Sequence, residues 1–99
     1  MTAPTDDQTT LGQVTMRYWA SARAAAGTDS EALEVPGPVP LAVLLQRVRA
    51  AHADSSRFSD VLACCSVMVG DRPVTTDDPS AVMVEPGSTV EFLPPFAGG

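Results

Sequence analysis

The chain has 99 residues, the length of one domain, and 44% of them are hydrophobic, so a packed core is expected. Acidic residues outnumber basic ones by 12 to 6, the net charge is −6, and every cation is an arginine. Nucleic acids and anionic membranes bind clustered cations, so neither is expected as a partner.

The first 13 residues, MTAPTDDQTTLGQ, contain little to bury and are expected to form a disordered tail. They lack the basic and apolar stretches of a secretory signal, and no apolar run approaches the roughly 18 residues of a membrane helix. Cys64 and Cys65 are adjacent, a spacing that suits neither a mutual disulfide on a strand nor a zinc or redox CxxC site. We therefore expect free thiols, at least one of them in the core, and a cytoplasmic protein.

The first half of the chain predicts two strands and one helix. VTMRYWA, residues 14–20, alternates apolar and polar side chains as a half-buried strand does, and SARAAAG predicts a short helical turn with a glycine cap. EALEV, residues 31–35, predicts a second strand that PGPVP stops. Residues 40–52 then place leucine and valine at helical spacing, with proline in the first turn.

The second half predicts mostly strands. Residues 53–63 are ambiguous but compatible with a further helical turn, and CSVMV, residues 65–69, predicts a strand. A tight turn leads to a short strand or turn at 72–76, and a short apolar stretch follows at 82–84. STVEFL, residues 88–93, predicts the closing strand, whose pairing must end at the two prolines that follow.

This order of elements predicts an α+β roll. A single amphipathic helix can be packed only if the strands form one sheet with an apolar face for it to cover. The alternation in the strands and the helical spacing predict the core, whose members are Val14, Met16, Tyr18, Leu33, Val35, Val67, Val69, Val90 and Phe92 on the sheet and Leu41, Leu44, Leu45 and Val48 on the helix.

Few residues of the chain suit catalysis. His52, the one histidine, follows the predicted helix and is expected to be a surface residue or to interact with the helix dipole. Asp77 and Asp78 precede a proline and are expected to begin a loop rather than to bind a metal. No second histidine or basic cluster stands near the cysteines in sequence to lower the pKa of a thiol. We expect no metal and no cofactor on this chain.

The C-terminal stretch FLPPFAGG is the exception. Gly98 and Gly99 lack a Cβ atom, so their backbone can pass through a slot too narrow for other residues. Pro94 and Pro95 favour an extended conformation, and the six residues from Pro94 span at most about 20 Å. Such a stalk could deliver the Gly99 carboxylate into the active site of another protein, where adenylation would make it an acyl electrophile. A merely frayed end would explain the glycines but not Phe96.

FLPPFAGG resembles the C-terminus of the family of molybdopterin synthase small subunits, which are ubiquitin-like (β-grasp) sulfur carriers. VTMRYWASARAAAGTD resembles the opening strand of that family, and VEPGSTVEFLPPFAGG resembles its closing strand and tail. The likeness covers residues 14–99. The sequence VGDRPV stands where the family often has an Asn-Gly-like turn, and this difference does not touch the tail.

The resemblance implies a β-grasp domain at 14–93 and a diglycine tail at 94–99. It further implies that a partner enzyme uses ATP to adenylate Gly99 and that a sulfur donor converts the acyl-adenylate to a thiocarboxylate. The chain would then dock on the large subunit of molybdopterin synthase and give its sulfur to cyclic pyranopterin monophosphate. On this resemblance the chain is expected not to be catalytic alone. Gly99 and Gly98 are expected to carry the chemistry, and the partner contacts are expected at Phe96, Pro95, Pro94, Ala97, Leu93, Trp19 and Arg17.

Three alternatives remain open. A sulfur carrier for thiamin or cysteine biosynthesis would share the fold and the diglycine. A ubiquitin-like modifier would be activated in the same way but would transfer its acyl group to a lysine of another protein. A non-enzymatic interaction module would use the tail only as a ligand. The intact mass after expression with the sulfur-transfer enzymes distinguishes them, because a thiocarboxylate replaces one oxygen by sulfur.

Overall fold

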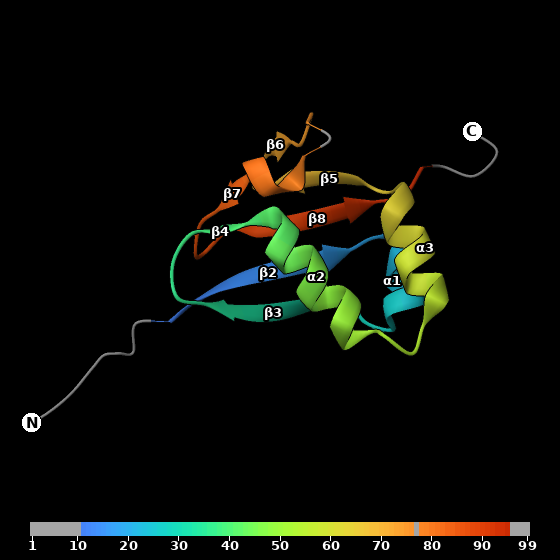
Figure 1. Cartoon of the computed structure of the whole chain (residues 1–99). Coiled ribbons are helices and arrows are strands. Elements are labelled where there is room, and N and C mark those ends of the chain that lie inside the picture. The colour runs from blue at the N-terminus through green and yellow to red at the C-terminus, as the bar shows by residue number, and fades with distance from the viewer. Residues whose placement is uncertain (1–10, 77, 96–99) are drawn as a thin grey trace, which may run out of the picture.

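The computed structural model describes residues 11–76 and 78–95 and contains a five-stranded sheet with helices on one face (Figure 1). The sheet has the strand order β3-β2-β8-β5-β6, and a separate two-stranded sheet pairs β4 with β7. No helix within these ranges is long and apolar enough to span a membrane. The elements are β2 (Gly12–Tyr18), α1 (Ala20–Ala26), β3 (Ser30–Val35), β4 (Val39–Pro40), α2 (Leu41–Ala51), α3 (Ser56–Cys64), β5 (Ser66–Val69), β6 (Arg72–Pro73), the 3-10 helix η1 (Pro79–Ala81), β7 (Met83–Val84) and β8 (Thr89–Leu93).

The sheet is mixed because its two central strands run parallel. β2 pairs with β3 in antiparallel and with β8 in parallel orientation, so the first and last strands of the domain lie side by side. β5 closes the other flank of β8 in antiparallel orientation. The register places Phe92 of β8 between Tyr18 of β2 and Val67 of β5, all on the face that α2 covers. The α+β roll expected from the order of the elements is confirmed.

The core matches the set predicted from the two periodicities. Nine of its thirteen members are buried, and the other four, Leu33, Leu45, Val67 and Val69, are partly buried against them. Alternation along the strands and helical spacing along α2 are local properties, so the sequence alone could identify these faces. Four further buried residues were not predicted: Ala22, Phe58, Leu62 and Val84.

The ambiguous segment after α2 is a third helix, α3. The side chain of Ser55 caps it by accepting a hydrogen bond of 3.1 Å from the backbone N–H of Phe58. β5 begins only at Ser66, so Cys64 ends α3 and Cys65 follows it. The prediction of a strand from residue 65 was wrong by one residue, and the two cysteines are not neighbours on a strand. Both are free thiols, as expected.

The N-terminal boundary also differs from the predicted one. β2 begins at Gly12, two residues before the expected start, because Gly12 and Gln13 pair with the end of β3. The carbonyl of Gln13 also accepts a hydrogen bond of 2.7 Å from the backbone N–H of Gly87. Leu11, just before β2, is exposed, and residues 1–10 of the predicted N-terminal tail lie outside the described residues, as does Asp77.

Candidate functional site

The end of β8 fixes the point from which the diglycine segment continues. β8 is a central strand, and its last residue, Leu93, lies opposite Ser66 of β5. On the other flank, the backbone N–H of Trp19 donates a hydrogen bond of 3.2 Å to the carbonyl of Phe92. Pro94 is half-buried and Pro95 is exposed, and neither has an N–H to extend the ladder. β5 on one side and Trp19 on the other therefore hold the end of β8, and the ladder of hydrogen bonds stops at the prolines.

Arg17 and Trp19 form an exposed pair beside this root. Arg17 lies next to Glu91 in the parallel register of β2 and β8, on the face opposite the core. Its guanidinium carbon is 4.7 Å from the centroid of the Trp19 ring, a cation–π contact. Trp19 is 41% exposed, so its ring is open to a partner. We call Arg17, Trp19, Leu93, Pro94 and Pro95 the tail-root surface.

A tight turn sets the direction of Trp19. Its carbonyl accepts hydrogen bonds from the backbone N–H groups of Ala22 and Arg23, at 2.9 and 3.2 Å, in the first turn of α1. Ala20, the first residue of α1, has φ +49°, in the left-handed region that favours glycine. Such a conformation costs on the order of 1 kcal/mol for a residue with a Cβ atom and persists only where the surroundings impose it. The fold thus imposes the backbone path that leads out of Trp19.

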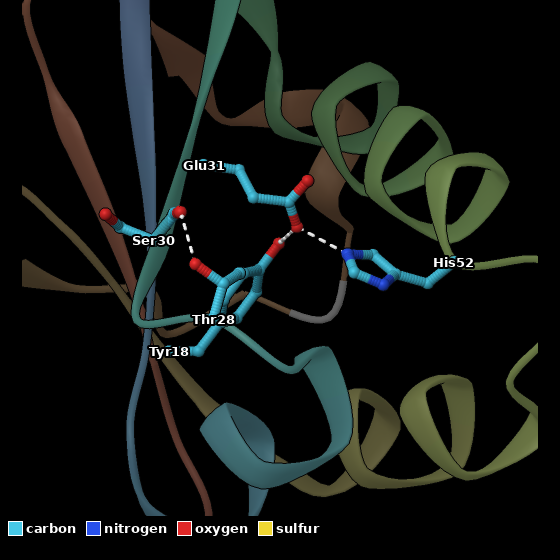
Figure 2. Close-up of polar contacts among 5 residues, drawn as sticks. All are labelled: Tyr18, Thr28, Ser30, Glu31 and His52. Atoms are coloured by element: carbon cyan, nitrogen blue, oxygen red, sulfur yellow. Dashed lines mark hydrogen bonds and ion pairs between the residues drawn. The ribbon is translucent and has the colours of Figure 1, made fainter.

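The inner face behind the root contains an aromatic cluster centred on Tyr18. The Tyr18 ring stacks on Phe92 at 5.6 Å and 21°, and it meets Phe58 of α3 edge-on at 5.6 Å. Its hydroxyl donates a hydrogen bond of 2.8 Å to Oε2 of Glu31 (Figure 2). Nε2 of His52 lies 2.5 Å from the same oxygen, and the His52 ring stacks on Phe58 at 4.2 Å. Aromatic packing and one carboxylate thus join β2, β3, α2, α3 and β8.

The proton positions in this cluster follow from the chemistry of its groups. Burial, and then the hydrogen bond to and charge of Glu31, raise the pKa of Tyr18 well above its ordinary value, so the hydroxyl keeps its proton and donates. Nε2 of His52 faces the same carboxylate oxygen and can donate a hydrogen bond to it in the tautomer that carries its proton on Nε2. The side chain of His52 is only 17% exposed, so the expectation of a surface residue was wrong. Glu31 is 21 residues away along the chain, and no local pattern could have paired the two.

The cysteines and the other ionisable groups offer little chemistry of their own. Burial, with a smaller contribution from Cys64, raises the pKa of Cys65 to about 11, and its Sγ donates to the carbonyl of Val61 at 3.3 Å. Such a thiol is a poor nucleophile at neutral pH. Cys64 is exposed. Within 11–76 and 78–95, no cluster of three or more histidine, cysteine or acidic residues could hold a metal ion.

The predicted site residues divide into two groups. Arg17, Trp19, Leu93, Pro94 and Pro95 lie together as the tail-root surface, and their role as partner contacts stays a prediction. Phe96, Ala97, Gly98 and Gly99 lie outside the described residues.

No protein-family model matches the chain. The chain is 32% identical over 84 residues to the molybdopterin synthase sulfur carrier subunit of Aspergillus niger. The match covers 85% of this chain and 91% of that protein, so it includes almost the whole of both.

Solved structures show the same fold. SAMP1, the small archaeal modifier protein 1 of Haloferax volcanii, superposes with a TM-score of 0.72 over 89% of this chain and 100% of that chain, at 18% identity. One chain from the complex of subunits 1 and 2 of the Helicobacter pylori molybdopterin-converting factor superposes with a TM-score of 0.57. The match covers 88% of this chain and 99% of that chain, at 16% identity. The fold is the ubiquitin-like β-grasp that the family resemblance implied.

Proposed function

Because this chain belongs to the family of molybdopterin synthase sulfur carrier subunits, we propose that it carries sulfur on the carboxyl group of Gly99. The observation that carries the proposal is the relationship to the Aspergillus niger protein across 85% of this chain, together with the segment PPFAGG directly after β8. Burial raises the pKa of the Cys65 thiol to about 11, so this group does not compete as a nucleophile at neutral pH.

The proposed chemistry takes place on partner proteins. An adenylating enzyme joins the Gly99 carboxylate to the α-phosphate of ATP, and pyrophosphate leaves. A sulfur nucleophile then displaces AMP and leaves a thiocarboxylate. The large subunit of molybdopterin synthase receives the tail, and the thiocarboxylate sulfur attacks cyclic pyranopterin monophosphate. Hydrolysis of the resulting acyl group regenerates the carboxylate. This chain supplies the acyl group at Gly99 and the segment that carries it into the partner's active site. The adenylating partner binds the ATP.

The geometry at the end of β8 supports this delivery. A reacting group at the end of a tail is useful only if the tail starts from a defined position. β5 pairs with Leu93 on one flank of β8, and the backbone N–H of Trp19 donates to the carbonyl of Phe92 on the other. The two prolines then favour an extended backbone without joining the sheet. From Pro95, the four residues to Gly99 can extend by at most about 14 Å, enough to enter a partner's active site.

The tail-root surface is proposed as the contact with both partners. It combines an exposed tryptophan with an arginine stacked on it, and these two residue types are enriched in the energetic centres of interfaces. The similar Helicobacter pylori structure is a complex of subunits 1 and 2 of the molybdopterin-converting factor, which supports a large subunit as one partner.

Reconstitution with the adenylating enzyme, ATP, a sulfur source and the large subunit tests the proposal. Deletion of Gly99 should reduce sulfur transfer by at least about a hundredfold, since it moves the carboxylate by one residue. The free energy of unfolding should not change. Intact mass should show replacement of one oxygen by sulfur in the wild type and none in the deletion. Full activity of the deletion variant would refute the proposal. Cys64→Ser and Cys65→Ser are matched controls that should retain transfer.

A second candidate function is protein modification, favoured by the likeness to SAMP1. The same adenylated Gly99 would then form an isopeptide bond with a lysine of another protein. This chain has no lysine, so it could not build lysine-linked chains of itself. Mass spectrometry of digested cell proteins would detect the two candidates separately. A C-terminal remnant of this chain on lysines supports modification, whereas thiocarboxylate without such a remnant supports sulfur transfer alone.

A further inference from the structure

The two edge strands of the five-stranded sheet, β6 and β3, differ in how readily another strand could pair with them. β6, at one edge, has only two residues, and one of them is Pro73, which has no N–H to offer a further strand. β3, at the other edge, has six residues and follows the border of the sheet with no described strand beside it (Figure 1). A strand of this length at the edge of a sheet is a template for pairing with another chain unless its outward backbone groups are occupied.

The register shows which backbone groups of β3 point away from the sheet. Tyr18 and Asp29 form a hydrogen-bonded pair, with 2.8 Å between the Tyr18 nitrogen and the Asp29 oxygen. In an antiparallel ladder, hydrogen-bonded and non-bonded pairs alternate, so the backbone groups of Ser30, Ala32 and Glu34 face outward.

Side chains of the same molecule already occupy two of these three outward carbonyls. Nη1 of Arg47, from α2, donates a hydrogen bond of 2.7 Å to the carbonyl of Glu34. Oγ1 of Thr28 donates a hydrogen bond of 3.1 Å to the carbonyl of Ser30 (Figure 2). The donor atoms therefore lie where the N–H groups of an added strand would have to lie.

A second copy of this chain is the strand that best fits this edge. Antiparallel pairing of two copies of β3 about Ala32 would place Ser30 of each copy opposite Glu34 of the other. The outward donors and acceptors would then all be matched, apart from those that Arg47 and Thr28 occupy. The side chains of β3 that share a face with these residues are small or solvated, so pairing would bury no bulky group.

We propose that Arg47 closes the β3 edge to a second copy of this chain. Thr28 is part of the turn before β3, whereas Arg47 reaches the edge from a different element and covers its far end. An arginine that donates to a main-chain oxygen prevents a partner N–H from reaching that oxygen and places a charged group in the path of the partner strand. This inference does not depend on the proposed function.

Analytical ultracentrifugation of the whole chain over a wide concentration range tests the proposal. Arg47→Ala should self-associate with a dissociation constant at least about tenfold lower than that of the wild type, since one hydrogen bond at each end of the pairing becomes available. Arg49→Ala is the matched control, because it removes the same charge from an exposed position of the same helix and should sediment as the wild type does. Arg47→Met, which keeps the aliphatic stem, should behave as Arg47→Ala does and replaces it if the alanine variant does not fold.

A second substitution locates the association at β3. The N–H of Ala32 points away from β2, so Arg47→Ala/Ala32→Pro loses no native ladder bond but lacks the central donor of the proposed pairing, and it should return to a monomer. Hydrogen exchange should show the Ala32 amide protected in Arg47→Ala at high concentration and exposed in the wild type. The proposal is overturned if folded Arg47 variants sediment as Arg49→Ala does, or if their association survives Ala32→Pro.

Discussion

The inner and outer faces of the sheet next to the end of β8 are built from neighbouring residues but have opposite properties. On the inner face, Tyr18 and Phe92 are buried, stacked on each other and tied to a carboxylate. On the outer face, Arg17 and Trp19 stack on each other in solvent. Alternation along two strands therefore places a stabilising cluster and a candidate binding surface on the two sides of one backbone. Substitutions on the inner face should consequently affect stability, and substitutions on the outer face should affect binding.

The largest effect on stability is expected at Phe92. Phe92→Ala should lower the free energy of unfolding by about 3–5 kcal/mol, because it leaves a cavity between Tyr18 and β5. Leu93→Ala, one residue further and on the other face, should lower it by only about 1 kcal/mol. Urea denaturation measures both. Equal losses at the two positions would show that the faces do not differ as described.

A smaller loss of stability is expected from Tyr18→Phe, which keeps the ring but removes the hydrogen bond to Glu31. We expect about 1–3 kcal/mol at neutral pH. The pKa of Tyr18 is raised in the folded state, so the contribution of its hydroxyl is present below the ordinary value of 10.0 and declines as pH rises above it. Denaturation curves of the wild type and the variant should therefore converge above pH 10. A difference that grows with pH would contradict the assigned protonation.

On the outer face, Trp19→Ala should affect binding rather than stability. Affinity for the large subunit or the adenylating enzyme should fall by more than about 1 kcal/mol, and the free energy of unfolding should stay within about 0.5 kcal/mol of wild type. Calorimetry with each partner measures the first quantity. Met83→Ala, an exposed apolar residue on β7, far from the end of β8 in Figure 1, is the control and should bind normally. Unchanged affinity of Trp19→Ala would remove Trp19 from the tail-root surface.

The smallest expected difference is chemical and separates the two cysteines. With a pKa of about 11, Cys65 has roughly one thiolate per thousand molecules at pH 8, whereas Cys64 is exposed. Iodoacetamide should therefore alkylate Cys64 first, and peptide mass spectrometry locates the label. Faster labelling of Cys65 would place it on the surface instead.

The sequence by itself determined the class of fold, most of the core and the chemical proposal for the tail. The alternation at 14–18 and 90–92 and the helical spacing at 41–48 are local patterns, and they identified the buried faces without knowledge of which strands pair. The segment PPFAGG was recognisable because prolines and glycines restrict or free the backbone in ways that the neighbouring residues do not alter.

Only the tertiary structure decided the contacts between distant segments. The parallel pairing of β2 with β8 joins the two ends of the domain, and the His52–Glu31 pair and the Arg47–Glu34 hydrogen bond link α2 to β3. In α3, Phe58 and Leu62 are buried because Tyr18 and its neighbours provide a surface for them. The segment that contains them is too short for its apolar spacing to predict this burial. Such contacts depend on register and packing across the sheet, and no local periodicity encodes them.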